Sequence, residues 1–199
     1  EGIFISHEHS DHIAGLQQLL KRFDIPVYTK QGTWREIQDK LIVPKNQLIE
    51  LTKGSLTLGN LIVEPFAVSH DAADPIGINV FAGKDKATVV TDTGVISDSI
   101  LRRMDDTTLL VLEANYDPHM LRFGPYQPFL KQRVASDEGH LSNEMAAQAL
   151  LMMNRPDFMQ VILAHRSENN NNAVLVTQTI GKMLVDGGVR IGPEMKLQH

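Results

Sequence analysis

The apolar residues gather in five short runs that are rich in β-branched side chains, and each run is followed at once by a polar residue. Runs of this length and composition predict buried strands. The polar residues that follow them can all bind a metal ion or move a proton. The runs are residues 2–6 before His7, 63–69 before His70, 86–90 with Thr91 before Asp92, 108–112 before Glu113, and 159–164 before His165. The pattern therefore predicts that the chemistry of this protein lies at the ends of strands.

Between these runs, apolar positions recur with the spacing of helices. Thr33 and Glu36 have the spacing of a capping box at the start of one of them. Residues 51–68 instead predict a hairpin, with Gly59 and Asn60 at its turn. The predicted helices cover residues 12–23, 33–41, 97–104, 126–134, 142–153 and 173–186.

The order of these elements predicts the domain organisation. The hairpin and the paired strands near residues 78–91 indicate antiparallel or mixed sheets rather than a purely parallel one. The sequence contains no internal repeat and no linker-like stretch, and its one low-complexity tract is the asparagine run 169–172. We therefore expect a single α/β domain over residues 1–199.

Charge and cysteine content narrow the choice of partners and ligands. With 42% hydrophobic and 22% charged residues, the 199-residue chain has the composition of a soluble globular protein. Its net charge of −5 means that any nucleic acid must be attracted by local Lys and Arg clusters or by bound cations. The absence of cysteine leaves nitrogen and oxygen as metal ligands and is compatible with a reducing compartment. No apolar run is long enough for a bilayer and no export leader is evident, so we expect a cytoplasmic protein without a membrane partner.

The stretch His7–His12, "HEHSDH", concentrates metal-binding side chains. While the chain stays extended, His7, His9 and Asp11 project to one side, and His12 joins them once the helix begins. A single histidine is more often a surface or capping residue, but packing alone gives no reason for this spacing. We therefore interpret the stretch as a metal-binding corner. Glu8 points to the opposite side, which favours a helix-entry or surface carboxylate.

The strand-end residues His70, Asp92 and His165 supply the remaining candidate ligands. Each has a simpler explanation when taken alone, because Asp92 could belong to a turn before Gly94 and His165 could lie in a loop. Their shared position after strands favours one common site. Together with the corner they make five histidines and two carboxylates, a set that suits two divalent ions with a shared oxygen ligand and room for water.

This series of ligand residues, taken in order, resembles the metallo-β-lactamase superfamily over essentially the whole chain. The resemblance implies a four-layer αββα sandwich with the site at one edge of its two sheets. Relatives carry strands before the first ligand motif, so we expect those N-terminal strands to be missing here, and a homodimer could cover the strands left exposed. The resemblance implies that His7, His9 and His70 hold one metal, that Asp11, His12 and His165 hold the other, and that Asp92 bridges both.

Further motifs are similar to the YycJ (WalJ) type of bacterial hydrolases within this superfamily. They are "TDTG" at 91–94, "LEANYD" at 112–117, "GHLSNE" at 139–144 and "SENNNN" at 167–172. This resemblance implies a phosphodiesterase, most simply a DNA exonuclease, with DNA favoured over RNA as the nucleic-acid substrate. Glu113 and His140 fall on motifs that in ribonuclease Z relatives form a pair protonating the departing oxygen. The alternative is that backbone groups satisfy a buried Glu113 and that His140 is part of the N-cap region of the helix predicted at 142–153.

The implied mechanism is the attack of a metal-bridging hydroxide on phosphorus. Asp11 or Asp92 would orient the hydroxide, and Glu113 and His140 would act at the leaving group. Five histidines suit zinc, whereas the carboxylates also admit manganese. The alternatives are a thioester, lactone or β-lactam hydrolase on the same fold, or a metal-dependent binding protein without turnover.

Three weaker features remain open. Lys131 and Arg133 follow the aromatic-rich residues 123–129 and could contact a nucleic acid, although a solvated helix face is an equal interpretation. His119 follows Pro118, where a helix can begin. Residues 169–172 could line a substrate groove, but a turn that caps the next helix is the simpler account.

Overall fold

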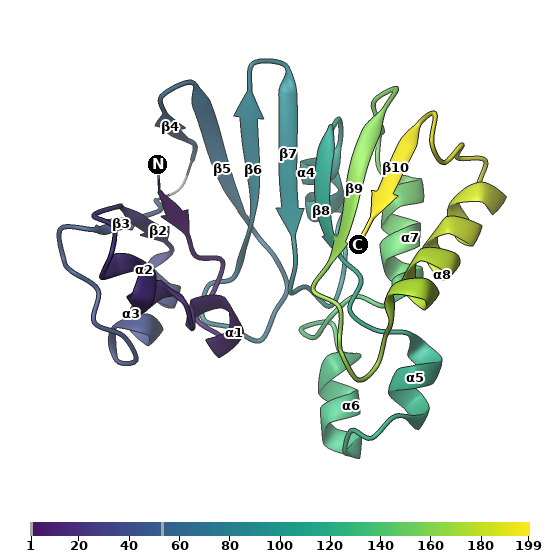
Figure 1. Cartoon of the computed structure of the whole chain (residues 1–199), viewed down its shortest axis with the longest axis horizontal. Helices are drawn as coiled ribbons and strands as arrows, with labels where there is room; N and C mark the ends of the chain where they lie inside the picture. The colour runs from purple at the N-terminus through teal and green to yellow at the C-terminus, as the bar shows by residue number, and fades with distance from the viewer. Residues whose placement is uncertain (1, 53) are drawn as a thin grey trace.

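The computed structural model describes residues 2–52 and 54–199. It contains a seven-stranded mixed sheet in the order β10-β9-β8-β7-β6-β5-β4 and a three-stranded parallel sheet in the order β1-β2-β3 (Figure 1). The larger sheet consists of β4 (Leu56–Leu58), β5 (Leu61–Ala67), β6 (Ile76–Ala82), β7 (Asp85–Val90), β8 (Leu109–Glu113), β9 (Met159–Ala164) and β10 (Met195–Gln198). The smaller consists of β1 (Ile3–Phe4), β2 (Val27–Thr29) and β3 (Leu48–Glu50).

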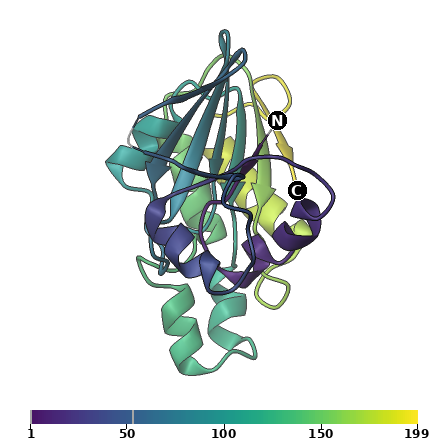
Figure 2. The ribbon, with the colours of Figure 1, turned by 90° about the vertical axis from the view of Figure 1, so that its left-hand side faces the viewer.

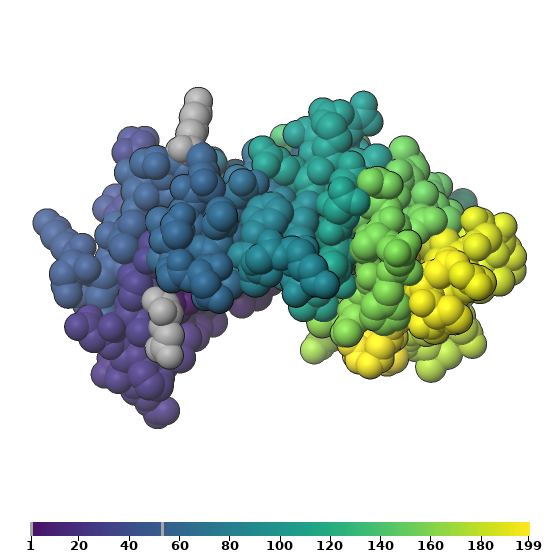
Figure 3. All heavy atoms as spheres, turned by 90° about the horizontal axis from the view of Figure 1, so that it is seen from above, coloured from purple at the N-terminus to yellow at the C-terminus, as the bar shows by residue number. Residues whose placement is uncertain are grey.

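Helices lie outside the two sheets. α1 (Ser10–Ile13), α2 (Leu16–Leu20) and α3 (Gln31–Gln38) belong to the N-terminal part, and α4 (Asp98–Met104), α7 (Asn143–Met152) and α8 (Ala173–Asp186) lie on the larger sheet. α5 (Pro118–Phe123) and α6 (Pro128–Val134) project beyond the ends of the strands, as two perpendicular views show (Figures 1 and 2). Seen from above, the chain runs from one end of the long axis to the other (Figure 3).

Apolar burial explains the layers. The main core joins the helix-covered face of β8 and β9 to α7 and α8. Among its fully buried residues are Leu112, Val161, Leu150 and Ile180. A second core joins the smaller sheet to its helices through a cluster that includes Ile37 of α3. Between the sheets lies a third cluster of Tyr28, Leu51 and Ile76, with Ile78 packed against it. The order helix, sheet, sheet, helix confirms the predicted αββα sandwich.

The predicted hairpin is confirmed, because β4 pairs antiparallel with β5 across the turn at Gly59, which has a φ of 63°. The helices expected at 97–104, 142–153 and 173–186 are also confirmed, to within a residue at each end. The helix expected over 12–23 is wrong as a single element: it is split into α1 and α2 around Ala14 and Gly15, where glycine is a poor helix former.

The capping box at Thr33 is also wrong. α3 begins at Gln31, with Lys30 as its N-cap, so that Thr33 lies inside the helix. Its buried hydroxyl donates to the carbonyl oxygen of Asp74, 3.2 Å away, which fixes α3 to the loop before β6. The Thr33 hydroxyl, which the local pattern assigned to the helix end, therefore forms a tertiary hydrogen bond instead. Within the described residues, none of the helices has the length and apolarity needed to span a bilayer.

Candidate metal centre

The candidate ligands meet where β7, β8 and β9 end. These three strands are parallel neighbours, so their carboxyl ends lie at one edge of the sheet (Figure 1). Asp92 follows β7 by two residues, Glu113 ends β8 and His165 follows β9 directly. Asp92 and His165 both have left-handed backbone conformations, with φ of 56° and 50°. Such conformations cost an L-residue about 1–2 kcal/mol and persist mainly where a site needs them.

The structure brings all seven predicted ligand residues together. Ligand atoms of His7, His9 and His70 lie within 4.8 Å of one another, and so do those of three further groups. These groups are Asp11, His12 and His165; His7, His12 and Asp92; and Asp92, Glu113, His140 and His165. Asp92 lies between the first two groups, because its Oδ1 is 3.3 Å from His165 Nε2 and 3.7 Å from His70 Nε2.

The histidine orientations fit divalent metal ions. His70 Nδ1 lies 3.1 Å from the carbonyl oxygens of Glu138 and Gly139, to which it can only donate, so its Nε2 carries a lone pair. Ser6 Oγ lies 3.1 Å from His7 Nδ1, and His7 Nε2 is buried without a hydrogen-bond partner among the described residues. Buried lone pairs that converge in this way are costly unless something binds them. The orientation of these imidazoles therefore fits divalent metal binding.

Burial and neighbouring charges set the ionisation of these groups. Burial, with the adjacent His12, lowers the pKa of His7 to about 3, so its imidazole is neutral at neutral pH. Burial alone would raise the pKa of Asp92, but the adjacent His12 and His165 hold it well below its usual range. A neutral imidazole beside an ionised carboxylate is the form in which both groups ligate metals.

Glu113 is fully buried and accepts four hydrogen bonds. Its Oε1 lies 2.8 Å from His140 Nδ1 and 2.7 Å from His165 Nδ1. Its Oε2 accepts from the backbone N–H groups of Thr93 and Leu141, at 3.2 and 3.1 Å. Burial opposes ionisation, but the hydrogen bonds from His140 and His165 outweigh it and lower the pKa of Glu113. Burial likewise opposes the charge on His165, yet its bond to Glu113 raises the pKa of His165 to about 9.

The predicted Glu113 and His140 are thus in contact, and the contact between Glu113 and His165 is an addition that the sequence did not indicate. The alternative prediction, that backbone groups satisfy the buried Glu113, is also met, because Oε2 accepts two backbone N–H bonds while Oε1 contacts His140. His140 lies two residues before Ser142, which is the N-cap of α7 because its hydroxyl accepts from the N–H of Met145.

The interpretation of Glu8 as a surface carboxylate is wrong. Only 6% of Glu8 is exposed, and its Oε1 accepts from the N–H of Ala73 at 2.8 Å. The loop after His70 thus covers Glu8, a long-range contact that no local pattern indicates.

Sequence reasoning missed two further residues. Ser6 Oγ lies within 3.3 Å of Nδ1 of both His7 and His12, so one hydroxyl orients two imidazoles. Asp71 forms an ion pair with Arg133 and places Oδ1 3.6 Å from His70 Nε2. Asp71 directly follows a predicted ligand in the sequence, and that was the one available signal.

The asparagine run has the structural role expected of a capping turn. Asn172 is the N-cap of α8, and its side chain accepts from the N–H of Leu175 at 2.8 Å. Asn171 is buried and donates to the carbonyl oxygen of Ala114 at 3.0 Å. His119 lies in the first turn of α5, which begins at Pro118, and its ring packs on Phe123.

Two stacked sheets flanked by helices, with imidazoles and carboxylates clustered at the strand ends, define a metal-dependent hydrolase of the metallo-β-lactamase fold. A family model described as "Beta-lactamase superfamily domain" matches residues 1–165. The chain therefore belongs to the β-lactamase superfamily.

Comparison with individual proteins shows which members of this superfamily the chain is similar to. The chain is 35% identical to the exodeoxyribonuclease YycJ of Bacillus anthracis, over 98% of this chain and 75% of the relative. It is 32% identical to the exodeoxyribonuclease WalJ of Streptococcus pneumoniae, over 99% of this chain and 75% of that one. The crystal structure of YhfI from Bacillus subtilis, a metallo-β-lactamase fold protein, matches with a TM-score of 0.72 at 17% identity, covering 99% of this chain and 74% of YhfI.

Proposed function

We propose that this protein is a two-metal phosphodiesterase that degrades DNA as an exonuclease. The observation that carries the proposal is the 2.8 Å contact between Glu113 Oε1 and His140 Nδ1 at the edge of the ligand cluster. A cluster of metal ligands alone would serve carbonyl hydrolysis as well. The histidine held by a buried carboxylate adds a group suited to protonating a leaving oxygen. The relatives named as exodeoxyribonucleases support DNA as the substrate.

The proposed ligand sets follow three of the four groups of neighbouring ligand atoms, and in the fourth we assign Glu113 and His140 to proton transfer instead. His7, His9 and His70 would hold one ion, and Asp11, His12 and His165 the other, with Asp92 shared. Zinc suits the five imidazoles, and manganese is the alternative that the carboxylates admit. Bound cations of this kind lower the pKa of water and offset the charge of a phosphate group.

The chain's own residues divide the remaining work. Glu113 is buried behind the histidines, so it is a positioning residue that holds Nδ1 of His140 and of His165. His140 is left with Nε2 open to the groove, where it would hold the proton for the leaving oxygen. The Asp92 side chain is buried, whereas the Asp11 side chain is exposed at the opening of the ligand cluster. Either carboxylate would be able to orient the attacking water.

A homodimer in the cytoplasm is the accompanying proposal. Val89 of β7 and Leu109 of β8 are 37% and 36% exposed. Both lie on the sheet face that carries the smaller sheet, since Val89 pairs with Ile78 of the inter-sheet cluster and Leu109 pairs with Ala87 of the same strand as Val89. A second copy could cover them, and light scattering of the purified protein would test this.

A panel of substrates tests the proposed reaction. The protein, loaded with zinc or with manganese, is assayed on end-labelled double-stranded DNA, single-stranded DNA, RNA, bis-p-nitrophenyl phosphate, a chromogenic cephalosporin and a glutathione thioester. We expect cleavage of DNA and of the small phosphodiester. Cleavage of the cephalosporin or the thioester alone would support the carbonyl hydrolase instead.

The variant His140→Ala tests the carrying observation. We expect kcat to fall about 100-fold or more, the usual contribution of a general acid, with both metals retained. Metal content is measured by mass spectrometry. His119→Ala, an exposed histidine on α5, is the matched control and should leave both quantities unchanged. Loss of both metals in His140→Ala would make His140 a ligand and remove the proposed acid.

A further inference from the structure

A groove of about 360 Å³ leads away from the ligand cluster along α6. Asp11, His140 and His165 line its inner end, and Tyr126 and Arg166 line its outer part. An adjoining pocket of about 330 Å³ shares those three inner residues and reaches Asp92. The groove is therefore continuous with the candidate site, and its volume falls within the range of about 300–1,000 Å³ typical of small-molecule sites.

Tyr126 offers a supported aromatic surface in this groove. Its ring packs against a cluster formed by Tyr116, Leu121 and Val134, which are all buried. Its hydroxyl accepts from Asn169 Nδ2 at 3.4 Å, so the ring is also tethered at its tip. A half-buried ring held from behind and lining an open groove is suited to stacking with a nucleobase.

Arg166 offers an available positive charge in the same groove. It is exposed, and its guanidinium has no ion-pair partner among residues 2–52 and 54–199. The other cations nearby are engaged: Arg133 is paired with Asp71, and Lys131 donates to the carbonyl oxygen of Arg122. Arg166 directly follows the candidate ligand His165, which places it within one residue of the proposed reaction centre.

We propose that this groove is a nucleotide subsite: the nucleoside next to the scissile phosphodiester stacks on Tyr126, and its outer phosphate pairs with Arg166. The inference rests on the proposed function and adds to it the residues that select a polynucleotide over a small diester. Glu168 lines the same groove as an exposed carboxylate and opposes the binding of a phosphate.

Kinetics with two substrates separate this subsite from the reaction itself. For Arg166→Ala and Tyr126→Leu we expect the KM for a single-stranded oligonucleotide to rise about ten-fold, as expected for the loss of one stacked base or one phosphate contact. Arg166→Ala should not change kcat/KM for bis-p-nitrophenyl phosphate more than two-fold, because that substrate has no outer phosphate to pair with Arg166. Tyr126→Phe keeps the aromatic ring, so its KM for the oligonucleotide should equal that of the wild type.

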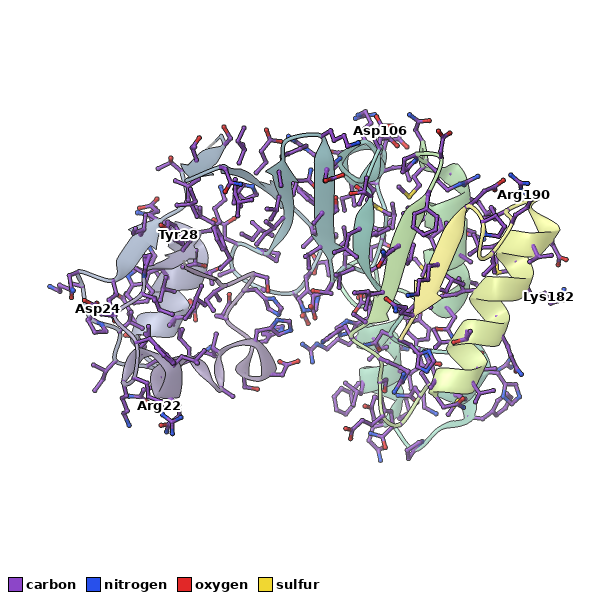
Figure 4. All side chains as sticks on the ribbon, turned by 45° about the horizontal axis from the view of Figure 1, so that its top comes forward. Arg22, Asp24, Tyr28, Asp106, Lys182 and Arg190 are labelled. Atoms are coloured by element: carbon purple, nitrogen blue, oxygen red, sulfur yellow. The ribbon has the colours of Figure 1, made fainter. Side chains whose placement is uncertain are left out.

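Charge gives a second readout with a defined sign. Arg166→Ala should reduce the slope of log affinity against log salt by about 0.7, the value for one phosphate contact on a single strand. Glu168→Gln should lower the KM for the oligonucleotide. Arg22→Ala is the matched control, because Arg22 is an exposed arginine far from α5 and α6 (Figure 4).

The outcomes distinguish the subsite from the proposed function. An unchanged KM and salt slope in Arg166→Ala and Tyr126→Leu, in an enzyme that cleaves DNA, would overturn the subsite and leave the nuclease in place. If the wild type cleaves no phosphodiester, fluorescence anisotropy with labelled single-stranded oligothymidylate still decides. Equal affinity of the wild type and Arg166→Ala would then overturn the subsite as well.

Discussion

Replacing Glu113 by glutamine tests how the site is held together. The carboxylate accepts on both oxygens, from two imidazoles on one side and two backbone N–H groups on the other. An amide of the same shape can accept on one side only. If its oxygen faces the imidazoles, its NH₂ opposes the N–H groups of Thr93 and Leu141. If its NH₂ faces the imidazoles, His140 and His165 must carry their protons on Nε2, and His165 loses the lone pair that would bind metal.

The magnitude follows from the number of donors left unpaired. If both imidazoles keep their protons on Nδ1, as metal binding by His165 Nε2 requires, either orientation of the amide leaves at least two buried N–H donors without an acceptor, and each costs about 1–3 kcal/mol. We therefore expect Glu113→Gln to lower the free energy of unfolding by about 2–6 kcal/mol. With an m-value of about 2 kcal/mol/M in urea, the midpoint of unfolding falls by about 1–3 M. Metal affinity should fall about 10–100-fold, as is usual when a hydrogen-bond partner of a ligating histidine is removed.

Urea titration followed by circular dichroism measures the first effect, and metal titration with mass spectrometric counting measures the second. Glu144→Gln is the matched control, because Glu144 is an exposed carboxylate in the first turn of α7 and its replacement should change stability by less than about 0.5 kcal/mol. If Glu113→Gln unfolds at the urea concentration of the wild type and keeps both metals, the orienting role assigned to this buried carboxylate is refuted.

Three further changes have defined outcomes. Gly94→Ala would place a Cβ 2.1 Å from the carbonyl oxygen of Ser136, so we expect the free energy of unfolding, measured by urea titration, to fall by about 2–3 kcal/mol. An unchanged midpoint of unfolding would contradict this close approach. Asn172→Ala removes the N-cap of α8 and should cost about 1 kcal/mol in the same assay. Chelation by EDTA should lower the melting temperature in calorimetry, because ions that bind only the folded state stabilise it, and an unshifted transition would argue against bound metal.

Much of the candidate site could be predicted because the pattern of strands places it. Asp92, Glu113 and His165 reach one edge of the larger sheet, since β7, β8 and β9 are parallel neighbours. Short-range spacing was equally informative in the stretch His7–His12, whose His7, His9, Asp11 and His12 all belong to groups of neighbouring ligand atoms. The sandwich itself followed from the resemblance, since the run pattern alone predicted only a mixed α/β domain.

The rest depends on contacts between segments far apart in the sequence. Thr33 donates to the carbonyl oxygen of Asp74 instead of capping a helix, and the loop at Ala73 buries Glu8. The strands β2, β3 and β10 have three, three and four residues, too few for alternation to reveal them. Each of these features is settled by tertiary packing, which local propensity does not encode.

The motifs that single out this type of hydrolase meet in one network of amides. Asn115 Nδ2 donates to the carbonyl oxygen of His165 at 2.8 Å, and Asn171 Nδ2 donates to Asn143 Oδ1 at 2.8 Å. These asparagines come from "LEANYD", "GHLSNE" and "SENNNN", segments that lie far apart in the chain. Because the network fixes the loop that carries both His165 and Arg166, a change at Asn171 should disturb the ligand cluster and the groove together. The sequence signature thus reflects how the loop is positioned, and the proposed reacting groups are the histidines and carboxylates beside it.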